Sequence, residues 1–347
     1  MSQTINSVRK ILLTMVVALL IGALFIVGIG ESPLDAYMAL LNGALNGKFR
    51  LGTTLAGFTP LLLTATAFAV AAKAGAFNVG VEGEVFLGGI TAAYIGINWT
   101  FLPAPLLYLA CFAGAMAVAA AWAYIPGALK AYYGVNEVCT TILMNTVALY
   151  ITSYLVSGPM SAGTANPQSD PVTVTLFQFM KPSSANVGLF IAIAVVILVV
   201  WMLNKTSWGY KIRTVGLNPV HADYVGIDSK KVFISAMMVS GMLGGIAGCI
   251  EVLGVHGYFL NNFATGLGTN GMLASLIVKN NVIFAPFMAF FLAVLKAGAM
   301  GMQQTTGVPK SLVDTITAVF IIVATMETAF QFAKRRKKEK GGKEANA

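Results

Sequence analysis

Apolar segments about 20 residues long recur along the whole sequence and are separated by shorter polar stretches. A helix of about 20 residues is long enough to cross the hydrocarbon core of a bilayer. Composition agrees, because 57% of the 347 residues are apolar and only 10% are charged. A soluble domain carries about 25% charged residues, so this chain has too few to cover a water-facing surface. The sequence therefore predicts an all-α protein that is largely solvated by lipid.

The apolar segments predict about ten transmembrane helices in a single transmembrane domain, residues 1–333. Between the first two, four apolar residues at helical spacing predict an interfacial helix over Ser32–Arg50. The longest polar segment, 158–186, is expected to be an extracytoplasmic loop. The predicted spans cover residues 11–29, 51–72, 84–97, 103–129, 135–157, 187–204, 232–254, 271–279, 282–302 and 311–332.

Basic residues predict the orientation. Counted over the N-terminus, the tail and the segments that flank the predicted spans, seventeen Lys and Arg fall on the side of the N-terminus and four fall on the other side. Cytoplasmic segments carry the excess of basic residues, so we expect a multi-pass protein with both termini in the cytoplasm. Seven of the basic residues lie in the tail 334–347, directly after an apolar segment. Such a run is typical of contact with anionic membrane lipid, and we expect no nucleic-acid partner.

Two of the predicted spans, 84–97 and 271–279, are too short to cross a bilayer alone. Each follows a glycine-rich stretch, Gly75–Gly83 and Gly266–Gly271. In the predicted topology the first break lies near the inner side and the second near the outer side, as in two halves related by an inverted repeat. Broken backbone at membrane depth persists where protein or a water-filled cavity surrounds it. These broken helices are therefore our candidates for the lining of a substrate path.

Two polar side chains lie at the first break. Asn78 and Glu82 are costly in lipid and must face protein, water or each other. They can cap the broken helices by accepting hydrogen bonds from free backbone N–H groups. Alternatively, they can contact a substrate directly.

A polar stripe is predicted on the span that begins near residue 135. Glu137, Thr141 and Asn145 are spaced four residues apart, so they share one face of a helix. A polar stripe on a membrane helix either holds neighbouring helices together or lines a pore. For Asn145, near the middle of the span, lining is favoured slightly.

The segment 205–231 is expected on the cytoplasmic side and contains a short helix. Asn218 can cap a helix that Pro219 begins, and Gly226 can end it. Val220, Ala222 and Tyr224 would then be available for contact with another protein. The alternative is an ordinary polar loop.

These three stretches carry a resemblance to a known family. GAFNVGVEGE at 75–84 resembles the GxFNIGVEGQ signature of ABC importer permeases for nucleosides and related sugars, and GVNEVCTTILMN at 134–145 is similar to their GVNEVxxTIMLN. The third stretch, from Arg213 and Gly216 through Asn218 and Pro219 to Ala222, Tyr224 and Gly226, resembles their coupling segment. The sequence departs from the first signature at Glu84, where the family usually has glutamine.

The resemblance implies the permease subunit of an ATP-driven importer in a bacterial cytoplasmic membrane, forming the path for nucleosides. It also implies three partners: an ABC ATP-binding subunit that docks on 205–231, a second permease subunit in a heterodimer, and an extracytoplasmic substrate-binding (lipo)protein. ATP would be bound by the partner. A simple-sugar (ribose-like) ABC permease is the first alternative. An ion-coupled secondary transporter that uses Glu82 with Asn78 is another.

The sequence lacks the residue patterns that several kinds of chemistry require. The chain contains no GxxxxGK[ST] phosphate-binding loop, and we find no catalytic constellation or set of metal ligands. Its three cysteines lie singly in apolar segments, and His221 and His256 are expected to be ordinary surface residues. We therefore expect a transport subunit without enzymatic activity, cofactor or metal.

Overall fold

The structure is a computed structural model that describes residues 16, 19–309, 311–316 and 318. Within these residues the regular structure is helical, with two isolated β-bridges. The chain falls into two compact units. The larger unit comprises residues 47–275 and 279–294, and the smaller comprises residues up to 46, 276–278 and those from 295 onward. The larger unit contains all three stretches singled out above.

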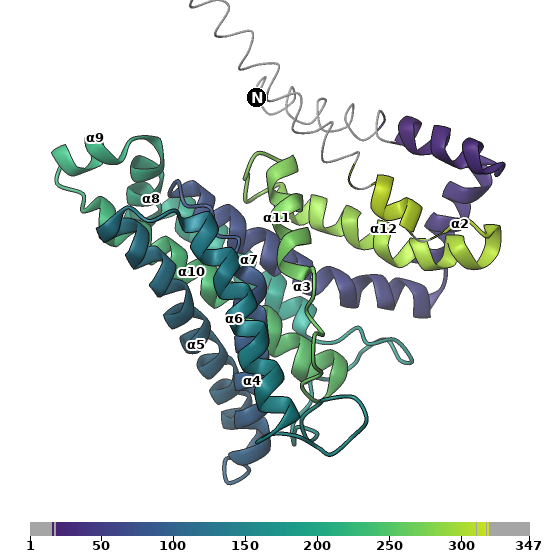
Figure 1. Ribbon diagram of the computed structural model, residues 1–347, viewed down its shortest axis with the longest axis horizontal. Helices are drawn as coiled ribbons and strands as arrows, with labels where there is room; N and C mark the ends of the chain where they lie inside the picture. Colours follow the sequence, from purple (N-terminus) through teal and green to yellow (C-terminus); the bar gives the residue numbers. More distant parts are fainter. Residues whose placement is uncertain (1–15, 17–18, 310, 317, 319–347) are drawn as a thin grey trace, which may run out of the picture. The chain divides into compact units, whose positions relative to one another are not determined.

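The helices are labelled in Figure 1. The smaller unit contains a helix over Leu19–Ile29 that bends by 113° into α2 (Pro33–Leu45), which lies within the predicted interfacial helix. The larger unit contains α3 (Lys48–Lys73), α4 (Val81–Asn98), α5 (Ala104–Tyr133), α6 (Glu137–Ser157), α7 (Gly188–Lys205), α8 (Ser207–Leu217), α9 (Pro219–Tyr224), α10 (Ser229–Ile250), the π-helix η1 (Glu251–His256) and the start of α11 (Leu267–Ile277). Helix α12 (Ala285–Thr306) continues from the larger unit into the smaller one.

The prediction of about ten transmembrane helices is not confirmed. In the described residues, six helices are long and apolar enough to cross a membrane, or seven if the bent pair counts as one span. Helix α4 is not among them because Glu82 and Glu84 occupy its first turn, and α11 has only 11 residues. The start of the first predicted span, most of 311–332 and the tail 334–347 lie outside the described residues. The inverted repeat stays a prediction.

Small residues on α10 let three helices pack at close range. Gly241, Gly244, Gly245 and Gly248 are all buried on α10. A Cβ at Gly88 of α4 would lie 2.5 Å from the Cα of Gly245, so the two backbones are in direct contact. On another side of α10, a Cβ at Gly245 would collide with the Ala115 carbonyl of α5. Close approach through small residues is a common way for helices to associate in membranes, and here it fixes α4 against α5 and α10.

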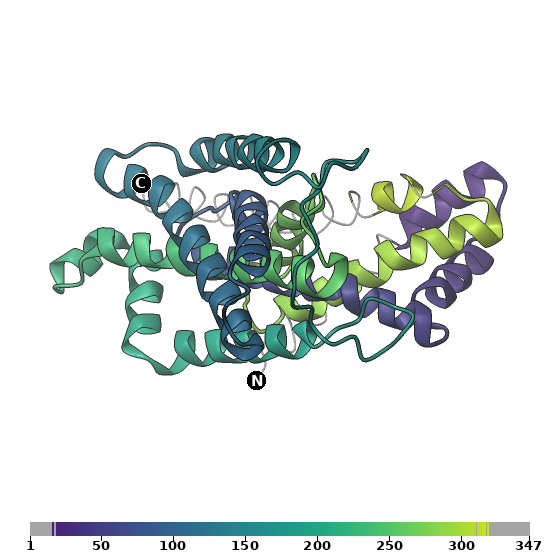
Figure 2. The ribbon, with the colours of Figure 1, turned by 90° about the horizontal axis from the view of Figure 1, so that it is seen from below.

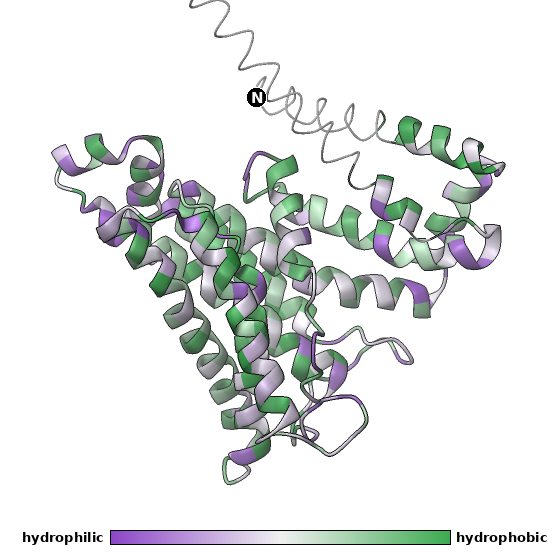
Figure 3. Ribbon diagram, in the orientation of Figure 1, coloured by the Kyte–Doolittle hydropathy of each residue, from purple (hydrophilic) through white to green (hydrophobic). Residues whose placement is uncertain are grey.

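Hydrophilic residues gather at the two ends of the larger unit (Figure 3). One end carries α8 and α9, and the other carries the segment 158–186, which has no helix, as predicted. That segment is held in place by main-chain hydrogen bonds. The Val172 N–H donates to the Gly257 carbonyl at 2.8 Å, and the Leu176 N–H donates to the Leu253 carbonyl at 2.7 Å. The loop therefore packs as an ordered part of the bundle.

The second break does not lie where the sequence predicted it. After η1, residues 257–266 run back along α4, where the Phe263 ring packs edge-on against Phe86 at 5.6 Å and against Phe259 at 5.2 Å. Burial of these aromatic rings draws the segment into the bundle. Helix α11 then starts beside the first turn of α4, and the two helices run in opposite directions (Figure 1). The two breaks therefore adjoin, and the prediction that they lie near opposite sides is wrong.

The packing of α10 generates a stability prediction. A Cβ at Gly248 would overlap the Val85 carbonyl of α4, so we expect Gly248→Ala to lower the free energy of unfolding by about 1–3 kcal/mol through overpacking. The apparent melting temperature of the purified protein in detergent measures this. Gly57→Ala on α3 is the matched control, since a Cβ there has open space. Equal melting temperatures for the two variants would contradict the packing described here.

Candidate functional site

Asn78 connects the first break to two helices. Its Oδ1 accepts a hydrogen bond from the Gly80 N–H at 2.9 Å, just before α4 begins. Its Nδ2 donates to Glu84 Oε1 and to Ser240 Oγ of α10, both at 2.9 Å. The side chain is buried. These contacts match the capping interpretation, because Asn78 satisfies a free backbone N–H group at the helix start.

Glu84, the position at which the sequence departs from the resembled signature, is buried beside Gly244 of α10. Its Oε1 accepts the bond from Asn78, whereas its Oε2 has no hydrogen-bond partner among the described residues. A glutamine oxygen could accept the same bond from Asn78. Glutamate at position 84 therefore keeps the hydrogen bond to Asn78 of the first break that a glutamine could also form.

Glu82 joins the two broken helices. Its Oε2 lies 3.3 Å from Thr269 Oγ1 and 3.5 Å from Thr269 N, both of which can donate to it. Glu82 stands in the first turn of α4, and Thr269 stands in the first turn of α11. A helix N-terminus carries a partial positive charge, so one carboxylate stabilises both termini. The approach is tight, since a Cβ at Gly268 would lie 2.5 Å from Glu82 N.

Helix α6 forms hydrogen bonds with the backbone of the same break. Asn145 Oδ1 accepts from the Gly83 N–H at 2.8 Å, and its Nδ2 donates to the Val79 carbonyl at 2.9 Å. Thr141, one turn earlier, is buried and lies against Gly80. Both polar groups of Asn145 are thus engaged by backbone of the break. These contacts favour the interpretation of Asn145 as interhelical glue.

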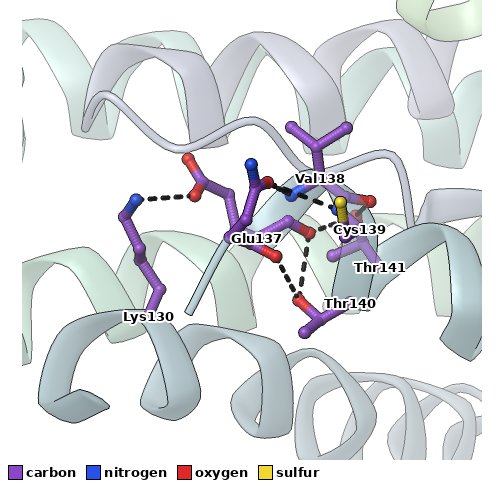
Figure 4. Close-up of polar contacts among 7 residues, drawn as sticks. Lys130, Glu137, Val138, Cys139, Thr140 and Thr141 are labelled. Atoms are coloured by element: carbon purple, nitrogen blue, oxygen red, sulfur yellow. Dashed lines mark hydrogen bonds and ion pairs between the residues drawn. The ribbon is translucent and has the colours of Figure 1, made fainter. Parts of the chain in front are cut away.

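Glu137 pairs with α5 at the start of α6 (Figure 4). Its Oε2 forms an ion pair with Lys130 Nζ of α5 at 2.9 Å. The helix start is capped by Asn136, whose Oδ1 accepts from the Val138 N–H at 2.9 Å. Thr141 Oγ1 donates to the Glu137 carbonyl at 2.7 Å. The structure therefore brings Asn78, Glu82, Thr141 and Asn145 together, whereas Glu137 stabilises the start of α6.

The short helix predicted in the segment 205–231 is confirmed. Helix α9 begins at Pro219, and the Asn218 Oδ1 caps it by accepting from the His221 N–H at 3.0 Å. Gly226 has a φ of +82°, a left-handed conformation that suits glycine at a helix end. Val220 and Tyr224 are exposed, but Ala222 is fully buried. The prediction that Ala222 is available for contact is therefore wrong, because its methyl group packs inward and holds α9 in place.

Helix α8 touches the beginning of the first break. Gly216 leaves no room for a Cβ against the Lys73 carbonyl at the end of α3. A Cβ at Gly75, two residues further along, would lie 3.7 Å from the Gly216 Cα. Arg213 is exposed and its guanidinium donates to Asn204 Oδ1 at 3.3 Å. A displacement of α8 would therefore act directly on the backbone that leads into α4.

Polar residues between α9 and α10 hold this end together. The Asp223 carboxylate accepts from the N–H and the hydroxyl of Ser229, both at 2.9 Å. Asp228 caps α10 by accepting from the Lys231 N–H at 3.0 Å. The hydrogen bonds from Lys231 hold the pKa of the Asp228 carboxyl below its usual range. Helix α9 is thus tied to the start of α10.

The face of α6 that points away from the larger unit is unusual for a membrane helix. Of the six candidate spans in the described residues, α6 is the least buried, yet its mean hydropathy of 1.4 is below the 2.3 of α7. The two helices lie on opposite sides of the larger unit (Figure 2). Tyr150 and Tyr154 are exposed on α6, and their hydroxyls have no partner among the described residues. Since lipid leaves such groups unsatisfied, this face suits water or another protein better than lipid.

Comparison with known proteins places the chain in a family. The family model described as the permease component of branched-chain amino acid transport systems matches residues 50–325. The chain belongs to this permease family. The match covers all but the first three residues of the larger unit, including both breaks and the α8–α9 segment.

Individual relatives are similar over most of their length. The guanosine ABC transporter permease of Bacillus subtilis is 32% identical over 95% of this chain and 96% of its own. The nucleoside ABC transporter permease of Lactococcus lactis is 31% identical over 91% of each chain. The glucose ABC transporter permease of Haloferax volcanii is 33% identical over 89% of this chain and 85% of its own.

Some residues of this permease site escaped the sequence analysis. Thr269 links the two breaks through Glu82, whereas Ser240 ties the first break to α10. Thr64 Oγ1 of α3 lies 3.3 Å from the Leu267 carbonyl at the start of α11. A polar side chain inside an apolar span is the signal that could have found Ser240 and Thr64. The description of His256 as an ordinary surface histidine is wrong, since it is partly buried with Nε2 3.8 Å from Glu251 Oε2. Among the described residues, no group of His, Cys, Asp and Glu is placed to hold a metal ion.

The two hydrogen bonds by which Asn145 clamps the backbone of the first break lead to a prediction. Asn145→Ala would leave the Gly83 N–H and the Val79 carbonyl without their partner, at a cost of about 1–3 kcal/mol for each buried group. We expect faster amide hydrogen exchange across residues 79–84 and a lower melting temperature. Thr146→Ala, at the next and exposed position, should change neither. Identical exchange in the two variants would contradict the role of Asn145 as a clamp.

Proposed function

We propose that this chain is the transmembrane permease subunit of an ATP-driven importer and forms the translocation path for nucleosides. The observation that carries the mechanism is the junction of two broken helices at Glu82 and Thr269. Substrate sites of transporters are commonly formed by discontinuous helices whose N-termini meet in the bundle. The names of the relatives from Bacillus subtilis and Lactococcus lactis support nucleosides as the substrate.

The α8–α9 segment is proposed to receive an ABC ATP-binding subunit. Leu217, Val220 and Tyr224 are exposed there and offer apolar contact area. Asn218, Pro219 and Gly226 shape α9, while the buried Ala222 anchors it. The contact of Gly216 with Lys73 then transmits movement of the ATP-binding subunit to the first break. Separation of Glu82 from Thr269 would open the path, and ATP is bound by the partner rather than by this chain.

Two further partners complete the proposed importer. The open face of α6 suits a second permease subunit. A heterodimer is supported by Bacillus subtilis, where two different guanosine ABC transporter permeases are similar to this chain, at 32% and 26% identity. An extracytoplasmic substrate-binding (lipo)protein would meet the end that carries 158–186. In this arrangement the α8–α9 end and both termini face the cytoplasm of a bacterial cell, in agreement with the basic residues.

Two alternatives differ from this proposal in substrate or in energy source. The glucose permease of Haloferax volcanii, at 33% identity, favours a simple sugar as the second candidate substrate. An ion-coupled transporter would use Glu82 with Asn78 as its ion site. Against it stands the membership in a family of ABC permease components, and Glu82 is already engaged by the N-terminus of α11.

Uptake into cells that express the complete importer tests substrate and energy source together. We expect labelled guanosine to accumulate, unlabelled uridine or adenosine to compete, and a hundredfold excess of ribose or glucose to leave uptake unchanged. Depletion of ATP should abolish uptake, while an ionophore that collapses ion gradients at constant ATP should not. Competition by the sugars would favour the sugar permease. Uptake that follows the ion gradient would contradict the ABC importer.

The proposed coupling route predicts a separation of assembly from transport. We expect Gly216→Ala to force α8 away from the Lys73 carbonyl, so that ATP-driven guanosine uptake falls at least about tenfold. The ATP-binding subunit should still co-purify, because the exposed residues of α9 are unchanged. Lys211→Ala, an exposed position on the same helix, is the control and should transport normally. Normal uptake by Gly216→Ala would exclude this route.

A further inference from the structure

A cleft opens where the far end of α4 faces the end of α6 and the segment 158–186. Its lining includes Thr91, Tyr94 and Asn98 of α4, Leu155 of α6, and Asp170 of the polar segment, and its volume is about 400 Å³. Pockets for small molecules start at about 300 Å³, so one molecule of nucleoside size fits. The cleft is separate from the junction of the two breaks, and none of the residues discussed above as site residues lines it.

The cleft combines a flat aromatic surface with hydrogen-bonding groups. The side chain of Tyr94 is 50% exposed. The Asp170 carboxylate is exposed and has no hydrogen-bond or ion-pair partner among the described residues. Asn98 donates through Nδ2 to the Tyr94 carbonyl at 2.9 Å, which leaves its Oδ1 as an acceptor. Ile90 and Leu155 supply an apolar floor.

Asp170 is held in a fixed position although its side chain is exposed. The neighbouring Ser169 is buried and pairs twice with Phe259, through its N–H to the Phe259 carbonyl and through Oγ, which accepts from the Phe259 N–H, both at 2.9 Å. Two residues beyond Asp170, Val172 is bound to Gly257 at 2.8 Å. Because the backbone on both sides of Asp170 is fixed, ligand binding has to order only its side chain.

We propose that this cleft is an entry site for nucleosides, in which the Tyr94 ring stacks on the base and Asp170 accepts hydrogen bonds from the ribose hydroxyls. The inference rests on the proposed function and adds a site to it. Aromatic side chains stack on any base, and a carboxylate is the usual acceptor for ribose hydroxyls. A nucleoside is uncharged and offers both surfaces, whereas a lipid tail would leave the carboxylate unsatisfied.

The location of the cleft suits an entry site. The cleft and the Glu82–Thr269 junction lie at different levels of the same helix, since Thr91 and Glu82 are nine residues and about 14 Å apart along the axis of α4. The cleft also lies at the end opposite to α8 and α9, away from the proposed ATP-binding subunit (Figure 1).

Binding of labelled guanosine to the complete importer in nanodiscs, with the substrate-binding protein omitted, tests the site. Asp170→Asn should raise the dissociation constant at least about tenfold, because one neutral amide oxygen replaces two charged acceptor oxygens and the amide NH₂ can only donate. The wild type should reject 2′,3′-dideoxyguanosine as a competitor, and Asp170→Asn should discriminate less between it and guanosine. Tyr94→Ala should weaken guanosine binding similarly, while Tyr94→Phe retains the stacking face and should bind normally. Thr164→Ala, exposed on the same polar segment, is the control.

The outcomes separate this inference from the proposed function. If the wild type imports guanosine but Asp170→Asn and Tyr94→Ala bind it like the wild type, the cleft is no nucleoside site and Tyr94 is an interfacial anchor. The permease proposal would then stand. If the wild type imports no nucleoside at all, the proposed function itself fails. If Asp170→Asn does not reach the membrane, the comparison of Tyr94→Ala with Tyr94→Phe still tests the site. Loss of guanosine binding in Tyr94→Ala but not in Tyr94→Phe would require that the ring stacks on the base.

Discussion

The structure depends on how broken backbone is satisfied inside an apolar bundle. Each helix start exposes N–H groups that have no partner within the helix, and water is scarce at this depth. Helices α4 and α11 start side by side, so two sets of such groups and two positive helix ends meet. Glu82 lies between the two starts and accepts from Thr269. Without a negative group there, the two like ends would repel each other.

The rest of the site supports that junction from three sides. Asn145 engages the backbone on both sides of the first break, Asn78 links it to Ser240 of α10, and Thr64 of α3 lies against Leu267. Each supporting group comes from a different helix. The junction is therefore a point where several helices meet, and a displacement of one of them is felt by the others.

Local signals in the sequence predicted those features that neighbouring residues determine. Asn218, Pro219 and Gly226 define a cap, a first turn and an end, and α9 has all three. The four-residue spacing of Thr141 and Asn145 placed both on the face that meets the first break. The depth of the second break was not predictable in this way. It follows from the burial of Phe259 and Phe263 against distant parts of the chain, and the glycine-rich sequence carries no signal for it.

The two kinds of contact around α4 differ in how easily they can separate. On one side, α4 meets α10 through Gly244, Gly245 and Gly248, which bring the backbone of α10 against the first half of α4, and separation would lose this close packing. On the other side, the junction with α11 consists of a few hydrogen bonds to Glu82, each worth about 1 kcal/mol net, or about 1.5–3 kcal/mol where a charge is involved. A push on α8 that reaches Gly75 would therefore part α4 from α11 before it parted α4 from α10. In the proposed mechanism the bundle of α4, α5 and α10 would move as one body, and the junction is where the path would open.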